Sequence, residues 1–105
     1  MKISVKGTDL DLTPAISEFI EQKIGSLSKF IGTFDEGGVA EARVEIQRTT
    51  QHHRHGNVFR AEVNLRLPGK VIRAEHSDEN VRAAIDAVKD KLKIEIDKYK
   101  GKLKD

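Results

Sequence analysis

The pattern of hydrophobic and polar positions divides the chain into strands and helices. Near the N-terminus, Ile3 and Val5 alternate with polar residues, which predicts a short strand ended by Gly7. Thr13-Pro14 is typical of a helix start, with threonine as the N-cap and proline at the first helical position. Apolar residues then recur at helical spacing up to Gly32, where we expect the helix to end. This arc consists of Ile16, Phe19, Ile20, Ile24, Leu27 and Ile31.

Three further strands and a second helix follow. Apolar and polar residues alternate from about Val39 to Arg48 and again from Phe59 to Leu67. Pro68-Gly69 predicts a hairpin turn into a strand from Lys70 to His76, and a long helix is expected from Asp78 onwards. The order β-α-β-β-β-α predicts an α+β fold. We expect a four-stranded antiparallel sheet, with two helices packed side by side on its apolar face.

The opposite sheet face is expected to be polar and self-neutralising. Outward positions of the second and third strands alternate between arginine and glutamate, a pattern that favours cross-strand ion pairs. Any binding surface should therefore lie on the helices and on the segment that joins these two strands.

Two basic rows flank the apolar arc of the second helix. The arc consists of Val81, Ala84, Ile85, Val88, Leu92, Ile96, Tyr99 and Leu103. One flank carries Arg82, Lys89, Lys93, Lys100 and Lys104, and the other carries Lys91, Lys98 and Lys102. We expect the acids at or near the outermost face, namely Glu79, Asp86, Asp90 and Asp97. Lysines spaced by roughly 5 to 10 Å can follow a phosphate backbone. The structural alternative is that they cover the apolar stripe and pair with neighbouring acids.

The segment from Gln47 to Gly56 is polar, basic and rich in hydrogen-bond donors. It could contact RNA, hold a zinc ion or form a solvated hairpin loop. Zinc is disfavoured because neither a cysteine nor a nearby carboxylate in the segment completes a tetrahedral ligand set, so we predict no metal. The candidate RNA-binding residues here are Arg48, His52, His53, Arg54 and His55.

Lys23 falls inside the apolar arc of the first helix. It could extend along that surface to reach solvent. Alternatively, it could point between the helices and, with Lys29, extend the basic surface of the second helix.

Composition excludes several classes of protein. The chain has 105 residues, enough for one domain over residues 1–105, with 37% hydrophobic and 34% charged residues. The net charge is only +2, but it is unevenly distributed: residues 1–46 carry −3 and residues 89–104 carry +4. There is no cysteine, no apolar run near the ~18 residues of a membrane span, and neither a phosphate-binding loop nor a nucleophile elbow. We expect a cytoplasmic protein that is not an enzyme and needs neither a cofactor nor a small-molecule substrate.

Several segments together resemble the ribosome hibernation-promoting factors, also called ribosome subunit interface proteins. These segments are Leu12-Thr13-Pro14-Ala15-Ile16, Lys23-Ile24-Gly25-Ser26-Leu27, His53-Arg54-His55-Gly56, Phe59-Arg60-Ala61-Glu62-Val63, Pro68-Gly69, Arg73-Ala74-Glu75 and Ala83-Ala84-Ile85-Asp86. The resemblance covers essentially the whole chain. It implies the same β-α-β-β-β-α fold and binding in the small-subunit channel used by messenger and transfer RNA. The family's basic helix positions correspond to Lys23, Lys29, Lys89, Lys91, Lys98 and Lys100.

The chain departs from the family pattern in the second helix. Asn80-Val81-Arg82 stands where the family usually has Asp-Met-Tyr, Ile94 replaces a usual arginine, and Lys93 replaces a common glutamate. Long members of the family add a C-terminal dimerisation domain. We therefore expect a short form or an N-terminal domain, monomeric on its own.

The leading hypothesis is a protein that silences translation by binding ribosomal RNA of the small subunit. One alternative is a double-stranded-RNA-binding module, since a helix, a three-stranded meander and a helix also make up that architecture. Another is a protein-interaction adaptor whose charged helices contact a protein partner. A steep dependence of binding on salt would distinguish RNA contacts from protein contacts.

Overall fold

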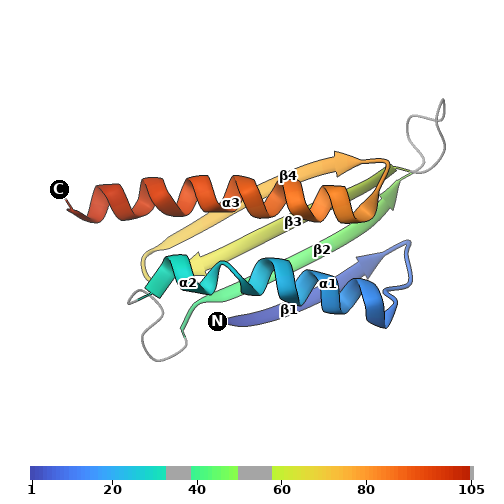
Figure 1. Ribbon diagram of the computed structural model, residues 1–105, viewed down its shortest axis with the longest axis horizontal. Coiled ribbons are helices and arrows are strands. Elements are labelled where there is room, and N and C mark those ends of the chain that lie inside the picture. Colours follow the sequence, from blue (N-terminus) through green and yellow to red (C-terminus); the bar gives the residue numbers. More distant parts are fainter. Residues whose placement is uncertain (33–38, 50–57, 105) are drawn as a thin grey trace.

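The computed structural model describes residues 1–32, 39–49 and 58–104 (Figure 1). In chain order the elements are β1 (Lys2–Thr8), α1 (Pro14–Gly25), α2 (Ser28–Ile31), β2 (Glu41–Thr49), β3 (Val58–Leu67), β4 (Lys70–Asp78) and α3 (Val81–Lys104). The predicted α+β class and order of elements are confirmed, with α2 as one additional short helix. In the described parts of the chain, no helix combines the length and the apolar character that a bilayer crossing requires.

The four strands form one sheet in the order β1-β2-β3-β4. β2, β3 and β4 pair antiparallel as predicted, but β1 pairs parallel to β2, with Val5 opposite Val44. The prediction of a wholly antiparallel sheet is therefore wrong at β1. The reason is the connection: α1 and α2 carry the chain back along the sheet, so that β2 starts at the same end as β1.

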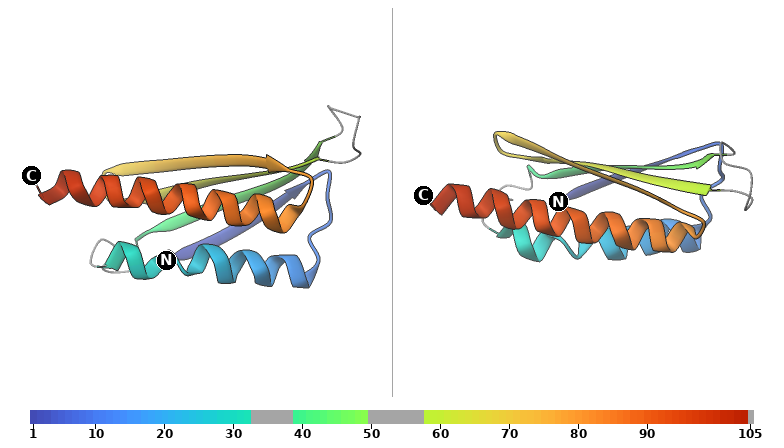
Figure 2. Two further views of the ribbon diagram at one scale, coloured as in Figure 1. Left: turned by 45° about the horizontal axis from the view of Figure 1, so that its top comes forward. Right: turned by 90° about the horizontal axis from the view of Figure 1, so that it is seen from above.

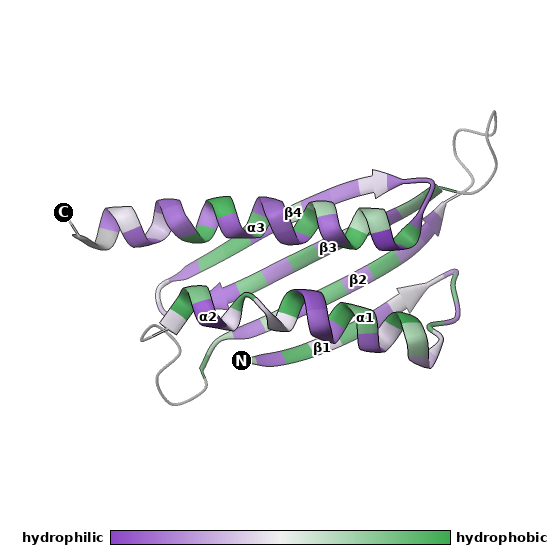
Figure 3. Ribbon diagram, in the orientation of Figure 1, coloured by the Kyte–Doolittle hydropathy of each residue, from purple (hydrophilic) through white to green (hydrophobic). Residues whose placement is uncertain are grey.

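The helices cover one face of the sheet and leave the other open (Figure 2). α1 and α3 lie side by side and run in the same direction, as Figure 1 shows. Strand residues alternate between this covered face and the open one, which produces the alternating bands of Figure 3. The covered face and the apolar sides of the helices form one core. Its fully buried large side chains are Ile20, Ile24, Leu27, Ile31, Ile46, Val63, Leu65, Ile85, Val88, Leu92 and Ile96.

The first helix begins as predicted but is interrupted before its predicted end. The Thr13 hydroxyl oxygen accepts a hydrogen bond from the amide of Ile16 at 3.2 Å, which caps α1. After Gly25 the backbone tightens, because the amide of Leu27 bonds three residues back to the carbonyl of Ile24 at 3.0 Å. The Ser26 hydroxyl also donates to a backbone carbonyl of the preceding turn. The apolar arc continues through this interruption, which is why the sequence pattern predicts one helix.

The second long helix starts three residues later than predicted. β4 extends to Asp78, and the side-chain oxygen of Asn80 accepts hydrogen bonds from the amides of Arg82 and Ala83 at 2.8 and 3.1 Å. An asparagine cap of this kind stabilises a helix by about 1 kcal/mol. Asn80 therefore sets the start of α3 and the position of the basic residues that follow.

Candidate nucleic-acid interface

The two predicted basic flanks of α3 face different parts of the molecule. On one flank, Lys93 faces α2, with its ammonium nitrogen 4.9 Å from the centre of the Phe30 ring. On the other flank, Lys91 lies over β4, where its ammonium donates a hydrogen bond to the carbonyl oxygen of Glu75 at 2.8 Å. The division predicted from helical periodicity is confirmed, and only one of the flanks adjoins α1 and α2.

Phe19 on α1 brings two cations from different helices together. The Lys23 ammonium and the Arg82 guanidinium each lie 5.5 Å from the centre of its ring. The face of an aromatic ring carries partial negative charge and attracts a cation by about 0.5–1 kcal/mol at an exposed site. Of the two predictions for Lys23, the position between the helices is therefore confirmed.

Asp86 is the anionic partner of Lys23. Its carboxylate oxygen lies 3.2 Å from the Lys23 ammonium, and the two side chains are 43% and 37% exposed. The expectation that Asp86 lies at or near the outermost face of the helix is wrong. α1 packs against this side of α3, so a residue that periodicity places outside the core arc still lies at an interface between helices.

Phe30 on α2 repeats the arrangement about three turns further along. Lys29 and Lys93 lie 5.1 and 4.9 Å from the centre of its ring. Lys93 also forms an ion pair with Asp97 at 3.3 Å, one turn later on α3. The sequence pattern assigns Phe19 to the apolar core and predicts no role for Phe30. The spacing of four residues between Phe19 and Lys23 is the one signal that could have indicated the first ring.

We call the surface where α3 meets α1 and α2 the basic seam. Lys89 and Lys100 belong to it because they follow Arg82 by seven and eighteen residues, about two and five helical turns, and so project on the same side of α3. The rise of ~1.5 Å per residue gives a length of roughly 27 Å from Arg82 to Lys100. The members of the basic seam are the cations Lys23, Lys29, Arg82, Lys89, Lys93 and Lys100, and the carboxylates Asp86, Asp90 and Asp97.

The carboxylates of the basic seam are each paired with a lysine. Lys23 pairs with Asp86, Lys93 pairs with Asp97, and the Lys89 ammonium lies 2.9 Å from the third carboxylate, that of Asp90. Among the residues that the structure describes, no carboxylate lies within ion-pair distance of the other three cations, which are Lys29, Arg82 and Lys100. Six cations and three carboxylates leave the basic seam with a net charge of +3.

The remaining predicted site residues lie apart from the basic seam. Lys91 and Lys98 are on the β4 side of α3, and Lys98 pairs with Glu95 at 3.3 Å. Arg48 is exposed near the end of β2, at the end of the sheet where α3 begins (Figure 1). The predicted contacts of His52, His53, Arg54 and His55 fall outside the described residues.

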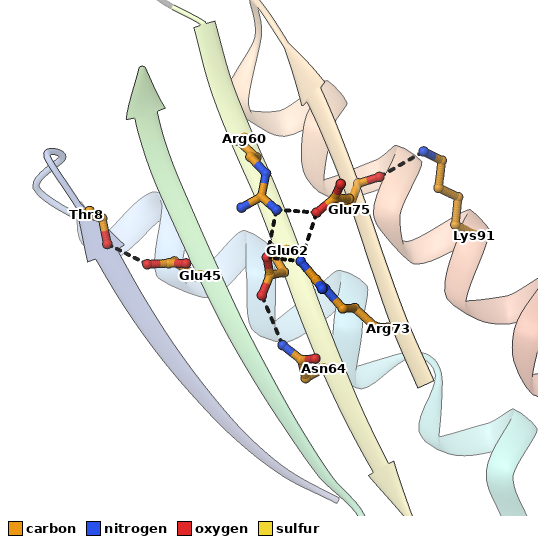
Figure 4. Close-up of polar contacts among 8 residues, drawn as sticks. All are labelled: Thr8, Glu45, Arg60, Glu62, Asn64, Arg73, Glu75 and Lys91. Carbon is orange, nitrogen blue, oxygen red and sulfur yellow. Dashed lines mark hydrogen bonds and ion pairs between the residues drawn. The ribbon is translucent and has the colours of Figure 1, made fainter. Parts of the chain in front are cut away.

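The open sheet face neutralises its own charge, as predicted. Glu62 on β3 lies 2.8 Å from Arg60 and 3.0 Å from Arg73, and its second oxygen accepts a hydrogen bond from Asn64 at 3.1 Å. Glu75 on β4 contacts both arginines as well (Figure 4). Two arginines and two glutamates thus form one closed network across two strands.

The network shifts the pKa of two of its members, Glu62 and Arg60. Burial alone raises the pKa of Glu62, but hydrogen bonds from Arg60, Asn64 and Arg73 outweigh it and hold the pKa below its ordinary value. The hydrogen bond to Glu62 in turn raises the pKa of Arg60. Both shifts favour the charged forms of Glu62 and Arg60, which are paired with each other, so this part of the sheet has little unsatisfied charge to offer a polyanion.

The chain matches known protein sequences over nearly its full length. Residues 3–104 match the family described as Sigma 54 modulation protein / S30EA ribosomal protein. A ribosome hibernation promotion factor of Lactococcus lactis is 32% identical over 98% of this chain and 51% of its own length. A ribosome hibernation promoting factor of Klebsiella oxytoca is 30% identical over 99% of this chain and 98% of its own length. The chain thus spans about half of the first relative and nearly all of the second.

Solved structures share the fold. The N-terminal domain of Thermus thermophilus Protein Y is 28% identical, with a TM-score of 0.76 over 94% of this chain and 99% of that domain. A ribosomal subunit interface protein from Coxiella burnetii is 21% identical, with a TM-score of 0.77 over 96% of this chain and 99% of that protein. The second likeness concerns the fold alone.

Proposed function

The chain belongs to the family described as Sigma 54 modulation protein / S30EA ribosomal protein, and we propose that it is a ribosome hibernation factor that binds small-subunit RNA through the basic seam. The observation that carries the proposal is the row of cations gathered from α1, α2 and α3 on one surface, with a net charge of +3. The open sheet face offers no comparable excess in its central network, because its arginines are already paired.

The row of cations in the basic seam is suited to binding phosphate groups. A row of cations roughly 27 Å long can contact several phosphates of an RNA backbone, and each contact releases condensed counterions. Lys29 and Arg82 are held over aromatic rings, and neither has a carboxylate partner among the described residues. Contact with a phosphate would therefore break no ion pair within that part of the chain. These two residues and Lys100 should contribute more affinity than Lys89 and Lys93, whose carboxylate partners compete with phosphate.

Inhibition of translation then requires only that the protein occupies its binding site on the ribosome. We propose that the bound protein fills the small-subunit channel used by messenger and transfer RNA, in the cytoplasm and as a monomer. Such a mechanism uses neither chemistry nor a cofactor, and it is competitive: ligands that exclude each other weaken each other's apparent affinity equally. Arg48 and the residues 52–55 extend the proposed contact beyond the helices.

Sedimentation with purified ribosomal subunits tests the proposal. The protein should pellet with the small subunit near one to one, with an affinity that falls steeply as salt rises, and it should suppress cell-free translation at the same stoichiometry. Comparable binding to free RNA duplexes would instead indicate a double-stranded-RNA module. Binding that barely responds to salt, without inhibition of translation, would indicate a protein-interaction adaptor.

A further inference from the structure

A cleft of about 560 Å³ opens on the side of α3 that faces away from the basic seam. It lies between the C-terminal part of α3 and the turn that joins β3 to β4. Figure 2 shows the ribbon of these two segments in two views. Its size falls within the range of ~300–1,000 Å³ that is common for small-molecule sites. Neither the basic seam nor the open sheet face contributes to its lining.

Tyr99 forms a wall of the cleft and is held in place at both ends. Its hydroxyl donates a hydrogen bond to the carbonyl oxygen of Pro68 at 2.8 Å, which ties α3 to the β3–β4 turn. Its ring is half-buried and packs against the hydrophobic core. The wall is therefore an aromatic surface that needs no rearrangement before a ligand binds.

Gly101 leaves the cleft open beside this tyrosine. Glycine is among the least favourable residues inside a helix, and neither packing nor backbone conformation requires it here. A Cβ atom at position 101 would meet nothing within 4 Å, and the backbone is not in the left-handed region. A longer side chain at this position would stand at the cleft, whereas glycine leaves access free.

The rim of the cleft is cationic. It carries Lys70, Lys98 and Lys102 and one acid, Glu95, which pairs with Lys98 at 3.3 Å. Within the described parts of the chain, Lys70 and Lys102 have no carboxylate at ion-pair distance. The cleft therefore combines an aromatic wall with two cations for which the described residues supply no anionic partner.

We propose that this cleft binds a free nucleotide, with the base against Tyr99 and the phosphate toward Lys70 and Lys102. Inorganic phosphate would leave the aromatic wall unused, and an uncharged aromatic ligand would leave both lysines without an anion. A nucleotide uses both features, since a base stacks on an aromatic ring and a phosphate pairs with ammonium groups. The site is separate from the basic seam, so the result of its test does not depend on the proposed ribosome binding.

NMR spectroscopy on the isotope-labelled protein tests the site with adenosine monophosphate as the probe. Tyr99 is the one tyrosine in the chain, so its ring signals report on the cleft without ambiguity. Millimolar nucleotide should shift these signals together with the amide signals of Gly69 and Gly101. Adenosine and ribose 5-phosphate should each bind more weakly than the intact nucleotide.

The double variant Lys70→Gln/Lys102→Gln should lower nucleotide affinity by roughly 25-fold, at about fivefold for each ammonium–phosphate contact near the surface. The control is Lys2→Gln/Lys6→Gln, which makes the same charge change on β1 and should leave affinity unchanged. Ring signals of Tyr99 that do not move, or equal losses in the two double variants, would overturn the proposal. So would an oligoadenylate or an acidic peptide that moves these signals when the free nucleotide does not.

Discussion

Three cations of the basic seam have no carboxylate partner in the described parts of the chain. Removing them should weaken ribosome binding far more than removing paired arginines from the sheet. The perturbation is the triple variant Lys29→Gln, Arg82→Gln and Lys100→Gln. Among the described residues, none of these cations has a carboxylate within ion-pair distance, so each is free to contact a phosphate. None of the three belongs to the buried core, so the fold should survive the substitutions.

The expected loss follows from counterion release. Each lost phosphate contact lowers the slope of log K against log salt by roughly 0.7 for single strands and 0.9 for duplexes. Three lost contacts should therefore lower the slope by roughly 2 to 3. At a salt concentration of about 0.1 M, the same relation corresponds to a loss of roughly 100- to 500-fold in affinity.

The matched control neutralises three arginines of the open sheet face, Arg43, Arg60 and Arg73. Each lies within 3.0 Å of a glutamate oxygen, so the net charge change is equal but little unsatisfied charge is removed. We expect this control to bind within about fivefold of the unmodified protein, since exposed charges beyond a Debye length of ~10 Å are largely screened. Affinity for small subunits is measured at several salt concentrations, below the melting temperature of every variant. Equal losses of affinity and slope in the two triple variants would refute the assignment of RNA contacts to the basic seam.

Three further predictions concern single groups. Asp86→Asn should raise affinity for small subunits about fivefold, because it removes an anion and releases Lys23 from its ion pair. The same substitution should change the free energy of unfolding by at most about 1 kcal/mol. An unchanged or lower affinity would contradict this prediction. Glu62→Gln should lower the free energy of unfolding by about 1 kcal/mol at pH 7. Because the pKa of Glu62 is lowered in the folded state, this difference should be complete above the unfolded carboxyl pKa of roughly 4.3 and should close as pH falls through the folded value; urea titrations that give the same difference in strong acid would count against the network. Removal of divalent metals with a chelator should leave the melting temperature unchanged, since the sequence from residue 47 to 56 has neither a cysteine nor a carboxylate to complete a zinc site with its histidines. A stoichiometric zinc content would contradict this prediction.

Periodicity predicts most of this fold because each element has one buried side. The alternation along β2 and β3 determines which residues face the core, and the arc on α3 determines which residues are buried there. The direction of β1 is different, since a strand with one apolar face shows the same alternation in a parallel or an antiparallel pair. The interruption after Gly25 also leaves no mark on the apolar spacing, because it depends on backbone hydrogen bonds and the Ser26 hydroxyl.

The candidate site, too, could be predicted only in part from the sequence. The two flanks of α3 follow from 100° per residue, so the sequence predicts which lysines lie together. Which flank faces α1 and which faces β4 depends on packing, and that decides the roles of Asp86, Phe19 and Phe30. Asp86 lies outside the core arc of its own helix, yet it pairs with Lys23 because α1 packs beside it. Contacts between elements far apart in the sequence therefore decide that Lys91 and Lys98 lie on the β4 side of α3 and not in the basic seam.

Binding to vacant and to loaded small subunits tests the central proposal most directly. The affinity of the protein is measured for purified small subunits alone and for subunits that already hold messenger and initiator transfer RNA. If the basic seam docks in the channel that these RNAs occupy, affinity for loaded subunits should fall strongly, and added protein should in turn weaken the binding of initiator transfer RNA by the same factor. Equal affinity for vacant and loaded subunits would contradict the occupancy mechanism, even if ribosome binding itself were tight and salt-dependent.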